Sequence, residues 1–410
     1  MHRLKVTFLN PAGRLGGAEI ALLDVLASLR NAHPSWELSL IVAASGPVRE
    51  RAASLGVNTK ILEFPRALAR LGDSAVAGRG AGSRMGTLAL TRAVAAAAVT
   101  LPSYVKKLRL ALRVLDPDII HTNGFKMHVL AALAAPRSTP LVWHVHDFVR
   151  SRPLMGRLLR MFRTRCSAVI TNSLSVAEDV QLLLGEGLFV KPILNGIDLN
   201  RFKPEGESLD LDVLAGLQPC GEQIVRIGLL GTMARWKGHE IFLRAISLVR
   251  ATRPVRAYII GDALYETLGS QYTLDELREA ARELGLAEVV GFTGFIESPE
   301  KAIRALDVVV HASVEPEPFG LVIVEGMACG RPVVASDSGG AAEVRRLSKG
   351  VLGFPPGDVT RLAEILVRLI DDDALRQRLG VEARASAETL FDRDRLAAQI
   401  EPVYRRVSNR

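Results

Sequence analysis

One stretch, residues 305–340, constrains the fold of this chain more than any other. Leu306 to His311 is a short apolar run rich in β-branched residues, which is typical of a buried parallel strand. A loop with two prolines and two glutamates follows, and Leu321 to Cys329 then has the pattern of a short helix. We expect Gly330 to end that helix in a left-handed conformation, and Pro332 to Ser336 to form a second buried strand. The loop therefore lies at the carboxyl end of a parallel sheet, where open α/β folds bind ligands.

Two carboxylates of this strand–loop–helix unit, Glu317 and Glu325, are eight residues apart. The spacing places Glu317 in the loop and Glu325 one turn inside the helix, beside the N–H groups of Gly320, Leu321 and Val322. Such N–H groups have no partner within the helix and can bind an anion. A phosphate there, with carboxylates that accept hydrogen bonds from hydroxyl groups, would suit a sugar nucleotide. A surface loop with solvated acids is the alternative that the two glutamates alone leave open.

Apolar runs alternate with helical patterns along the whole chain, which predicts an α/β protein with parallel sheets. The chain of 410 residues is too long for one ordinary core and suits two domains. We expect these over residues 1–200 and 201–392, and residues 192–204 contain an Asn-Gly sequence that is typical of a turn. The expected strands outside the stretch above are 4–9, 37–43, 60–64, 118–121, 140–145, 168–173, 224–230, 256–260 and 289–292.

Composition narrows the class of protein without choosing its partner. With 48% hydrophobic and 23% charged residues the chain can bury a core, so it is not a disordered protein. The net charge of +8 could serve nucleic acid, an anionic membrane or an anionic substrate. The three cysteines lack CxxC spacing and indicate neither a disulfide framework nor a zinc site. We also expect no signal peptide and no membrane-spanning segment, and hence a cytoplasmic protein.

The segment 66–113 is strongly basic, with Asp73 as its single acid. Its first half is rich in Gly, Ala and Ser and resembles a loop, whereas its second half has the pattern of a helix. Two interpretations stay open: a surface loop with a solvated helix, or a surface that binds an anionic membrane or an anionic acceptor. The basic residues are Arg66, Arg70, Arg79, Arg84, Arg92, Lys106, Lys107, Arg109 and Arg113.

Two further helix starts have residues suited to binding an anionic ligand. Gly16 and Gly17 begin a predicted helix over residues 18–29, and glycine lets the backbone approach a ligand closely. Their GxxGG pattern lacks the GxGxxG spacing of dinucleotide enzymes, which disfavours a dehydrogenase. Lys237 lies just before Gly238 at another helix start, where its charge and the helix dipole can neutralise a pyrophosphate.

The sequence EPFGLVIVEGMACGRPVVAS resembles the ExxxxxxxE motif of retaining GT-B glycosyltransferases of glycosyltransferase family 4. The resemblance implies that Glu317 faces the transferred sugar and that Glu325 binds the nucleotide ribose. Glu315 competes for the first role, but the spacing and the adjoining Phe319–Gly320 favour Glu317. The GGAE sequence also resembles the start of many family members, whose loop closes on the donor phosphates or the acceptor.

Two positions need comment beside this resemblance. Thr232 stands where many family members have a phosphate-binding arginine, so either Arg235 replaces that arginine or the donor is held differently. His146, followed by Asp147, resembles the HxHE/D motif on the acceptor side. A histidine at a strand end is by default structural, but the resemblance favours a role for His146 in positioning and polarising a hydroxyl group. We expect its pKa to lie near the working pH, and expect His144 to matter less because it lies deeper in the strand.

The resemblance implies two doubly wound, Rossmann-like domains of GT-B type that face a cleft, with the helix 393–410 packed back on the first domain. The resemblance implies retaining transfer of a hexosyl group from a nucleotide sugar to a glycan, lipid-linked or small-molecule acceptor. It implies no metal, no cofactor and no nucleic acid partner. A location at the inner face of the membrane would follow if 66–113 binds lipid. The alternatives are a GT-B epimerase or phosphorylase, and a non-catalytic scaffold that binds a membrane or polymer.

Overall fold

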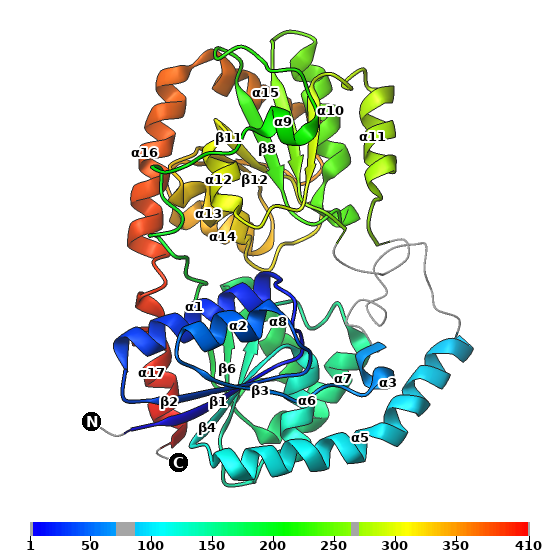
Figure 1. The fold of residues 1–410 in the computed structure, drawn as a ribbon, viewed down its shortest axis with the longest axis vertical. Helices are drawn as coiled ribbons and strands as arrows, with labels where there is room; N and C mark the ends of the chain where they lie inside the picture. Colours follow the sequence, from blue (N-terminus) through cyan, green and yellow to red (C-terminus); the bar gives the residue numbers. More distant parts are fainter. Residues whose placement is uncertain (1–2, 71–86, 264–269, 409–410) are drawn as a thin grey trace. The chain divides into compact units, whose positions relative to one another are not determined.

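The computed structural model describes residues 3–70, 87–263 and 270–408 (Figure 1). The chain divides into two compact units: unit 1 is Met1–Gly196 with Arg393–Arg410, and unit 2 is Ile197–Asp392. The sequence had placed this boundary at residue 200. Each unit contains one all-parallel sheet with helices on both faces, so the predicted architecture of two doubly wound domains is confirmed.

The sheet of unit 1 has seven strands in the order β3-β2-β1-β4-β5-β6-β7. The chain first adds strands on one side of β1 and then continues from β4 on the other side, so the topological switch point lies between β1 and β4. The strands are β1 (Lys5–Asn10), β2 (Glu37–Val42), β3 (Asn58–Ile61), β4 (Ile119–Asn123), β5 (Leu141–Val145), β6 (Cys166–Thr171) and β7 (Val190–Pro192).

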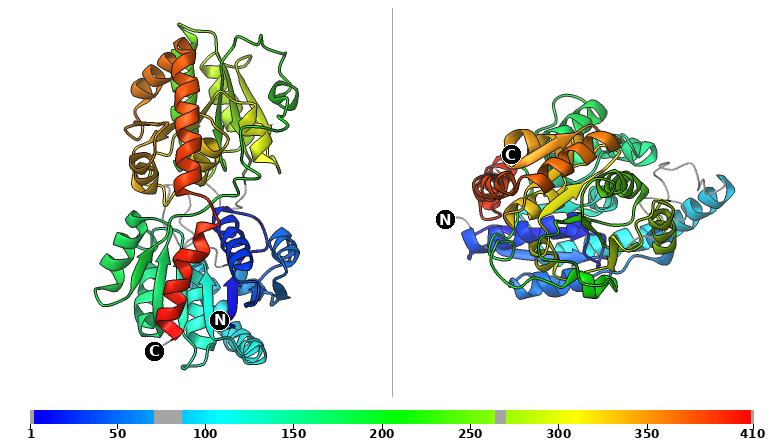
Figure 2. Two further views of the ribbon diagram at one scale, coloured as in Figure 1. Left: turned by 90° about the vertical axis from the view of Figure 1, so that its left-hand side faces the viewer. Right: turned by 90° about the horizontal axis from the view of Figure 1, so that it is seen from above.

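Alternate strand residues of unit 1 feed two separate hydrophobic cores. Val6 and Phe8 pack with α1, α2 and α17 on one face, whereas Leu9 packs with α5 to α8 on the other. The C-terminal helix α17 lies beside α1 and belongs to unit 1 (Figure 2). The helices of unit 1 are α1 (Gly17–Ala32), α2 (Pro47–Ser54), α3 (Arg66–Arg70), α5 (Thr87–Leu115), α6 (Phe125–Ala134), α7 (Pro153–Phe162), α8 (Leu174–Leu184) and α17 (Arg395–Ser408).

The sheet of unit 2 repeats this plan with six strands in the order β10-β9-β8-β11-β12-β13, and its switch point lies between β8 and β11. The strands are β8 (Arg226–Leu230), β9 (Arg256–Ile260), β10 (Val290–Gly294), β11 (Val308–His311), β12 (Val333–Ser336) and β13 (Val351–Phe354). The helices are α9 (Leu211–Ala215), α10 (His239–Arg250), α11 (Leu274–Glu283), α12 (Pro299–Arg304), α13 (Leu321–Ala328), α14 (Gly339–Leu347), α15 (Val359–Asp371) and α16 (Asp373–Leu390).

Residues 305–340, with which the sequence analysis began, form the predicted order of strand, loop, helix and strand. β11, α13 and β12 follow one another, and Gly330 has a φ of +69° just after α13. This left-handed conformation ends the helix because the position costs glycine little. Ser173 caps α8 by accepting a hydrogen bond from the Val176 N–H, which gives a partner to one of the free donors at the helix start.

Several boundaries differ from the sequence-based expectations. β3 begins two residues before its predicted position and β6 also begins two residues early, because pairing with the neighbouring strand, and not apolar content, decides where each begins. The helix predicted within 66–113 is longer than expected and continues through Pro102. Residues 71–86, including Asp73, Arg79 and Arg84, lie outside the described residues, as do the side chains of Arg70 and Arg92. Among the described residues, none of the helices is long and apolar enough to cross a bilayer.

Candidate active site

The two loops at the switch point of unit 2 hold two of the predicted site residues, Lys237 and Glu317, and the structure pairs them with each other. Lys237 ends a short 3-10 turn, Arg235–Lys237, that follows β8, and Glu317 lies in the loop after β11. The Lys237 Nζ atom lies 3.0 and 2.8 Å from the two carboxylate oxygens of Glu317. Because β8 and β11 are neighbours in the sheet, the fold brings together two residues that are 80 positions apart in the sequence.

Glu317 is buried, with 8% of its surface exposed, and two side chains besides Lys237 bind it. The His311 Nε2 atom and the Ser313 Oγ atom lie 3.2 and 3.0 Å from its Oε2 atom. Burial by itself raises the pKa of Glu317, but the charge of Lys237 and the hydrogen bonds from His311 and Lys237 outweigh this effect and hold the pKa well below its usual range. Glu317 is therefore a carboxylate at neutral pH, able only to accept hydrogen bonds.

Close backbone contacts fix the loops around this pair. Gly238 has a φ of +76°, and a Cβ atom there would lie 1.9 Å from the carbonyl oxygen of Ala312. Gly339, with a φ of +59°, lies against the backbone of Glu317 in the same way, and the Gly340 N–H donates to the Glu317 carbonyl at 2.6 Å. These glycines let the loops after β8, β11 and β12 touch, which restricts the position of Glu317.

The remaining residues predicted for this end of unit 2 lie on α13. Gly320 is the N-cap with a φ of +91°, and no side chain caps the helix, so the N–H groups of Leu321 and Val322 have no side-chain acceptor at the cap. Glu325 lies in the second turn and is half-buried. Glu315, the competing candidate, is also half-buried, whereas Glu317 is buried.

Arg235 has partners of its own within unit 2. Its guanidinium lies 2.8 Å from the Glu276 carboxylate of α11 and 4.3 Å from the centre of the Tyr272 ring. Thr232, where the family pattern has an arginine, is half-buried in the loop after β8. To replace that arginine, Arg235 would have to leave the contacts with Glu276 and Tyr272.

The candidate residues of unit 1 lie at the carboxyl ends of β1 and β5. Gly16 caps the start of α1, Gly17 is its first residue, and no side chain caps this helix either. His146 directly follows β5, and its Nε2 atom lies 2.6 Å from the Asn123 Oδ1 atom at the end of β4. The ring of His146 packs on that of His144, with 4.0 Å between the ring centres.

The expectation that the pKa of His146 lies near the working pH is wrong. Burial lowers the pKa of His146 to about 4, because a charged imidazole would lose its hydration there. His144 lies behind it and contacts His121, which in turn bonds the Tyr404 hydroxyl of α17 at 2.7 Å. Burial lowers the pKa of both of these histidines too, so all three rings are neutral at neutral pH.

Four polar residues of these two sites were not identified in the sequence: His311, Ser313, Asn10 and Asn123. Three of them end a strand of a switch point, and Ser313 follows β11 by two residues. A polar residue that ends an otherwise apolar strand was therefore an available signal. Which strands neighbour one another could not be obtained from the local sequence.

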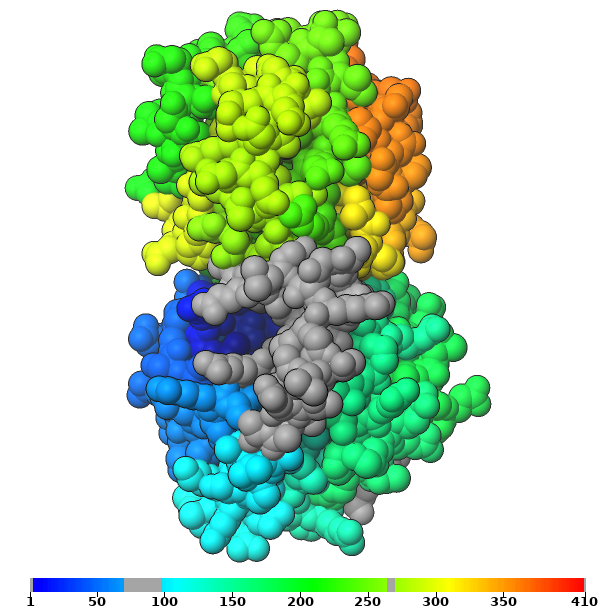
Figure 3. Space-filling model, turned by 90° about the vertical axis from the view of Figure 1, so that its right-hand side faces the viewer, coloured from blue at the N-terminus to red at the C-terminus, as the bar shows by residue number. Residues whose placement is uncertain are grey.

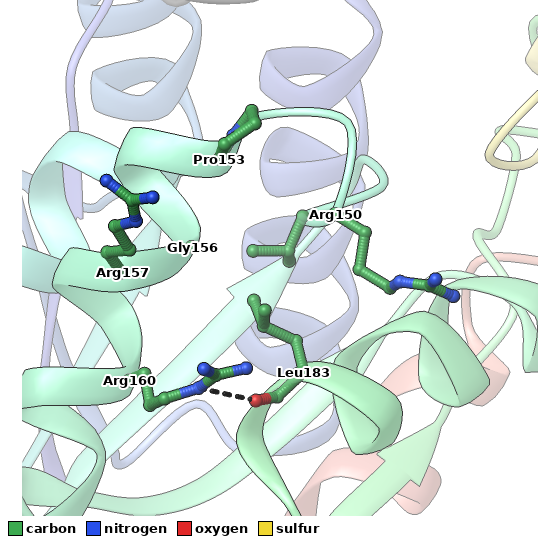
Figure 4. A pocket seen from close by; sticks show the side chains of 7 residues that line it. Arg150, Pro153, Gly156, Arg157, Arg160 and Leu183 are labelled. Carbon is green, nitrogen blue, oxygen red and sulfur yellow. Dashed lines mark hydrogen bonds between the residues drawn. The ribbon is translucent and has the colours of Figure 1, made fainter.

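A cavity of about 250 Å³ lies elsewhere in unit 1, between α7 and α8 (Figure 4). It is lined by Val149, Arg150, Pro153, Gly156, Arg157, Arg160 and Leu183. Arg160 donates to the Leu183 carbonyl at 3.0 Å. None of the predicted site residues lines this cavity.

Comparison with known proteins assigns both units to one class. Residues 16–201 match the family model Glycosyltransferase Family 4, and residues 224–372 match the model Glycosyl transferases group 1. Among curated proteins, the chain is 28% identical to a D-inositol 3-phosphate glycosyltransferase of Jonesia denitrificans over 308 residues, 70% of this chain and 72% of that protein. It is 34% identical to a phosphatidyl-myo-inositol mannosyltransferase of Mycobacterium leprae over 200 residues, 48% of this chain and 49% of that protein.

Solved structures agree over nearly the full length. The HepE protein of Anabaena, in complex with UDP-glucose, has a TM-score of 0.76 and 26% identity, and the match covers 98% of this chain and 99% of that one. Sucrose-phosphate synthase of Thermosynechococcus elongatus has a TM-score of 0.75 at 20% identity over 98% of each chain, which supports the fold alone. Both matches support the predicted GT-B fold. This chain is therefore a glycosyltransferase, and it belongs to glycosyltransferase family 4.

Proposed function

We propose that this protein transfers a hexosyl group from a nucleoside diphosphate sugar to a hydroxyl group, with retention of the anomeric configuration. The observation that carries the proposal is the buried pair of Lys237 and Glu317 at the switch point of unit 2. A cation, an acceptor-only carboxylate and the uncapped start of α13 all belong to these loops, which supports the proposal that they bind one nucleotide sugar. The cation and the helix start suit a diphosphate, and the carboxylate suits the hydroxyl groups of a sugar ring.

Each residue then has one role. Lys237 and the N–H groups of Leu321 and Val322 stabilise the charge that develops on the departing diphosphate. Glu317 accepts hydrogen bonds from hydroxyl groups of the transferred sugar, and Glu325 accepts them from the ribose. The bond between the anomeric carbon and the phosphate oxygen breaks, and a bond to the acceptor oxygen forms on the same face. The acceptor proton passes to the departing phosphate oxygen, and His146 positions and polarises a hydroxyl group.

The identity of the nucleotide is the next part of the proposal. HepE, 26% identical across nearly the whole chain, has been solved with UDP, with UDP-glucose, and with UDP and glucose. UDP is therefore the first nucleotide to test. We further propose that the reaction uses neither a metal ion nor a cofactor, because Lys237 and the start of α13 supply the positive charge that a diphosphate leaving group needs.

For the acceptor, we propose a glycan, a lipid-linked sugar or a small molecule. The relative from Mycobacterium leprae is by its name a phosphatidyl-myo-inositol mannosyltransferase, which supports tests of lipid acceptors. The basic helix α5 supports the same direction, since no acid occurs in Thr87–Leu115. An epimerase or phosphorylase, or a non-catalytic scaffold, is not favoured beside the match to two glycosyltransferase family models.

Thermal unfolding with a panel of nucleotides tests the donor assignment. UDP, GDP and ADP and their hexose conjugates are each added in excess, with the nucleoside monophosphates as controls. A ligand that binds only the folded protein raises Tm. At a free ligand concentration of 100 times Kd it stabilises the fold by about 2.7 kcal/mol. We expect one nucleoside diphosphate and its sugar to raise Tm, and Lys237→Ala to weaken that effect. An unchanged Tm with every diphosphate would contradict the proposal.

The stereochemistry and the metal requirement need a second experiment. The active donor is incubated with candidate acceptors, and the anomeric configuration of the first product is read by proton NMR. We expect the configuration of the donor to be kept and the rate to be unchanged by EDTA. An inverted product would disprove retention, and loss of activity in EDTA that Mg²⁺ or Mn²⁺ restores would disprove metal independence.

A further inference from the structure

The ends of β1, β4 and β5 hold a chain of three side chains whose hydrogen bonds have only one consistent direction. Asn10 ends β1, Asn123 ends β4 and His146 directly follows β5. Asn10 and Asn123 are fully buried, and His146 is half-buried. β1 and β4 are the two strands of the switch point of unit 1, where doubly wound folds bind ligands. None of the roles proposed above uses either asparagine.

A backbone carbonyl group, that of Ala12, sets the direction of these hydrogen bonds. The carbonyl oxygen of Ala12 lies 2.7 Å from the side chain of Asn10, and a carbonyl can only accept. The amide nitrogen of Asn10 must therefore face Ala12, which leaves the Asn10 Oδ1 atom, again an acceptor, 2.7 Å from the side chain of Asn123. The amide group of Asn10 cannot be turned round without placing two acceptors against each other.

The same argument orients Asn123. Its amide nitrogen faces the Oδ1 atom of Asn10 and also the carbonyl oxygen of Ala18 at 3.3 Å. Both partners are acceptors, so both hydrogens of this amide are used. The Asn123 Oδ1 atom is then turned to the His146 Nε2 atom at 2.6 Å, which must carry the hydrogen.

The other ring nitrogen of His146 is left as an acceptor. A neutral imidazole carries one hydrogen, and burial keeps this ring neutral by lowering its pKa to about 4. Nδ1 therefore has a bare lone pair, and this atom is buried without a hydrogen-bond partner among the described residues. The neighbouring titratable rings, His144 at 4.0 Å and His121 and His128 behind it, also have lowered pKa values and add no positive charge at neutral pH.

We propose that Asn123, oriented by Asn10, is a positioning residue that holds His146 as its Nε2–H tautomer and presents Nδ1 to a substrate hydroxyl group. The inference rests on the proposed role of His146 and adds what that role requires. A bare lone pair attracts a hydroxyl hydrogen and repels the oxygens of a phosphate. The position of Asn123 thus selects the kind of group that His146 can contact.

Histidine NMR and substitutions of Asn123 test the proposal. In protein labelled with ¹⁵N-histidine, a His146→Gln variant identifies the resonance. We expect the parent ring to be neutral, with hydrogen on Nε2, and not to titrate between pH 5 and 8. Asn123→Asp puts a carboxylate beside the ring, which should raise its pKa by about two units. The exposed Asn31→Asp change on α1 adds the same charge to unit 1 and should leave the titration as in the parent.

Transfer kinetics give the second measurement. In Asn123→Asp, kcat should fall on the acid side with the pKa that NMR gives for His146, because a protonated Nδ1 cannot accept a hydrogen bond. Asn123→Leu should lower kcat on the order of tenfold or more without that pH dependence, since the ring loses its orientation.

A parent ring with hydrogen on Nδ1, or an Asn123→Leu ring that keeps the parental tautomer, would overturn the proposal. The NMR result does not depend on activity, so it separates this inference from the proposed function. The tautomer and the pKa shift of the His146 ring could be as expected while His146→Ala keeps parental transfer. In that case Asn123 has no positioning role in the reaction, and the proposed role of His146 fails as well.

Discussion

Glu317 and Lys237 show how two ordinary side chains become a site when a sheet brings their loops together. Each alone would be a solvated surface charge, whereas here the carboxylate is 8% exposed and has four hydrogen bonds from Lys237, His311 and Ser313. A buried charge with several partners is costly to leave unpaired. The pair therefore contributes to stability as well as to the proposed chemistry.

Replacing Lys237 by alanine should affect both the stability of the fold and the rate of transfer. Loss of the cation leaves a buried carboxylate and should destabilise unit 2 by about 3 kcal/mol. It should also lower kcat on the order of 100-fold, and lower it more than it weakens donor binding, because the charge on the leaving group grows in the transition state. Denaturant unfolding and steady-state kinetics measure the two effects. Arg253→Ala is the control, since Arg253 forms an exposed ion pair with Asp371 and has no proposed role. An unchanged kcat in Lys237→Ala would exclude the proposed role.

The pH dependence follows from the lowered pKa of Glu317. A carboxyl group whose pKa is lower in the folded state stabilises the fold above its unfolded pKa, about 4.3, and loses that contribution as the pH falls through the folded value. Without Lys237 the pKa of Glu317 should rise, so the loss of stability should begin at higher pH than in the parent. Unfolding midpoints between pH 3 and 7 would show this difference.

His146→Ala gives a separate prediction for unit 1. The variant should reduce transfer to the acceptor by a larger factor than it reduces nucleotide affinity, because the ring is proposed to contact a hydroxyl group and not the nucleotide. His144→Ala should have the smaller catalytic effect, since its Nδ1 atom is occupied by His121 at 3.1 Å. Parental kcat/KM for the acceptor in a folded His146→Ala protein would end this assignment.

At the level of elements, the sequence predicted most strands and the helices next to the sites. The helix start at Leu321 and Gly330 were correct, and the predicted strand Leu306–His311 is β11, which begins two residues later, at Val308. Apolar periodicity and a left-handed glycine are local signals, which is why these elements could be predicted. β7 and β13 were missed because short edge strands depend on pairing with a neighbour. The partners of Glu317 and His146 were missed for the same reason, since they come from distant parts of the chain.

The helix α5 is the element with the clearest surface character. Its exposed apolar residues Val99, Leu110 and Val114 are 80%, 64% and 74% exposed. Lys106, Lys107 and Arg113 are exposed on the same helix (cyan in Figure 3). Apolar side chains flanked by basic ones are typical of helices that lie on anionic membranes. A solvated surface helix stays the alternative interpretation.

Sedimentation with liposomes separates the two interpretations. We expect binding to anionic vesicles that weakens with salt, and none to neutral vesicles. The double change Lys106→Glu and Lys107→Glu should weaken binding by about 30-fold or more, since each basic residue contributes about 1 kcal/mol. The control is the double change Arg278→Glu and Arg368→Glu, which makes the same charge change in unit 2 and should not weaken binding. Equal recovery in the supernatant with both lipids would favour the solvated helix.

At the level of the whole molecule, unit 1 is completed by the end of the chain. Unit 2 is inserted between Gly196 and Arg393, and α17 returns to the core of unit 1 with Leu396, Ile400 and Tyr404. Unit 1 thus cannot bury its core until residues 395–408 have been made. The family resemblance led us to expect this helix, whereas nothing in its local pattern indicated which unit it joins.

Ile400→Ala tests this dependence. Ile400 is fully buried, and truncation of a buried isoleucine costs about 2–5 kcal/mol. The substitution should lower the free energy of unfolding of unit 1 by that amount, whereas the exposed neighbouring change Gln399→Ala should cost about 0.5 kcal/mol or less. Urea unfolding measures both. Equal stability of the two variants would show that α17 contributes little to unit 1.

The central claim is that the switch-point loops of unit 2 bind and activate a nucleotide sugar. Its most direct test is calorimetric titration of three proteins with UDP, or with whichever diphosphate raises Tm, beside an assay of transfer. The parent should bind. Glu325→Ala should bind more weakly because the ribose loses its partner. Glu317→Ala should keep its affinity for the nucleotide and lose transfer. Parental binding and parental turnover in both variants would contradict the account.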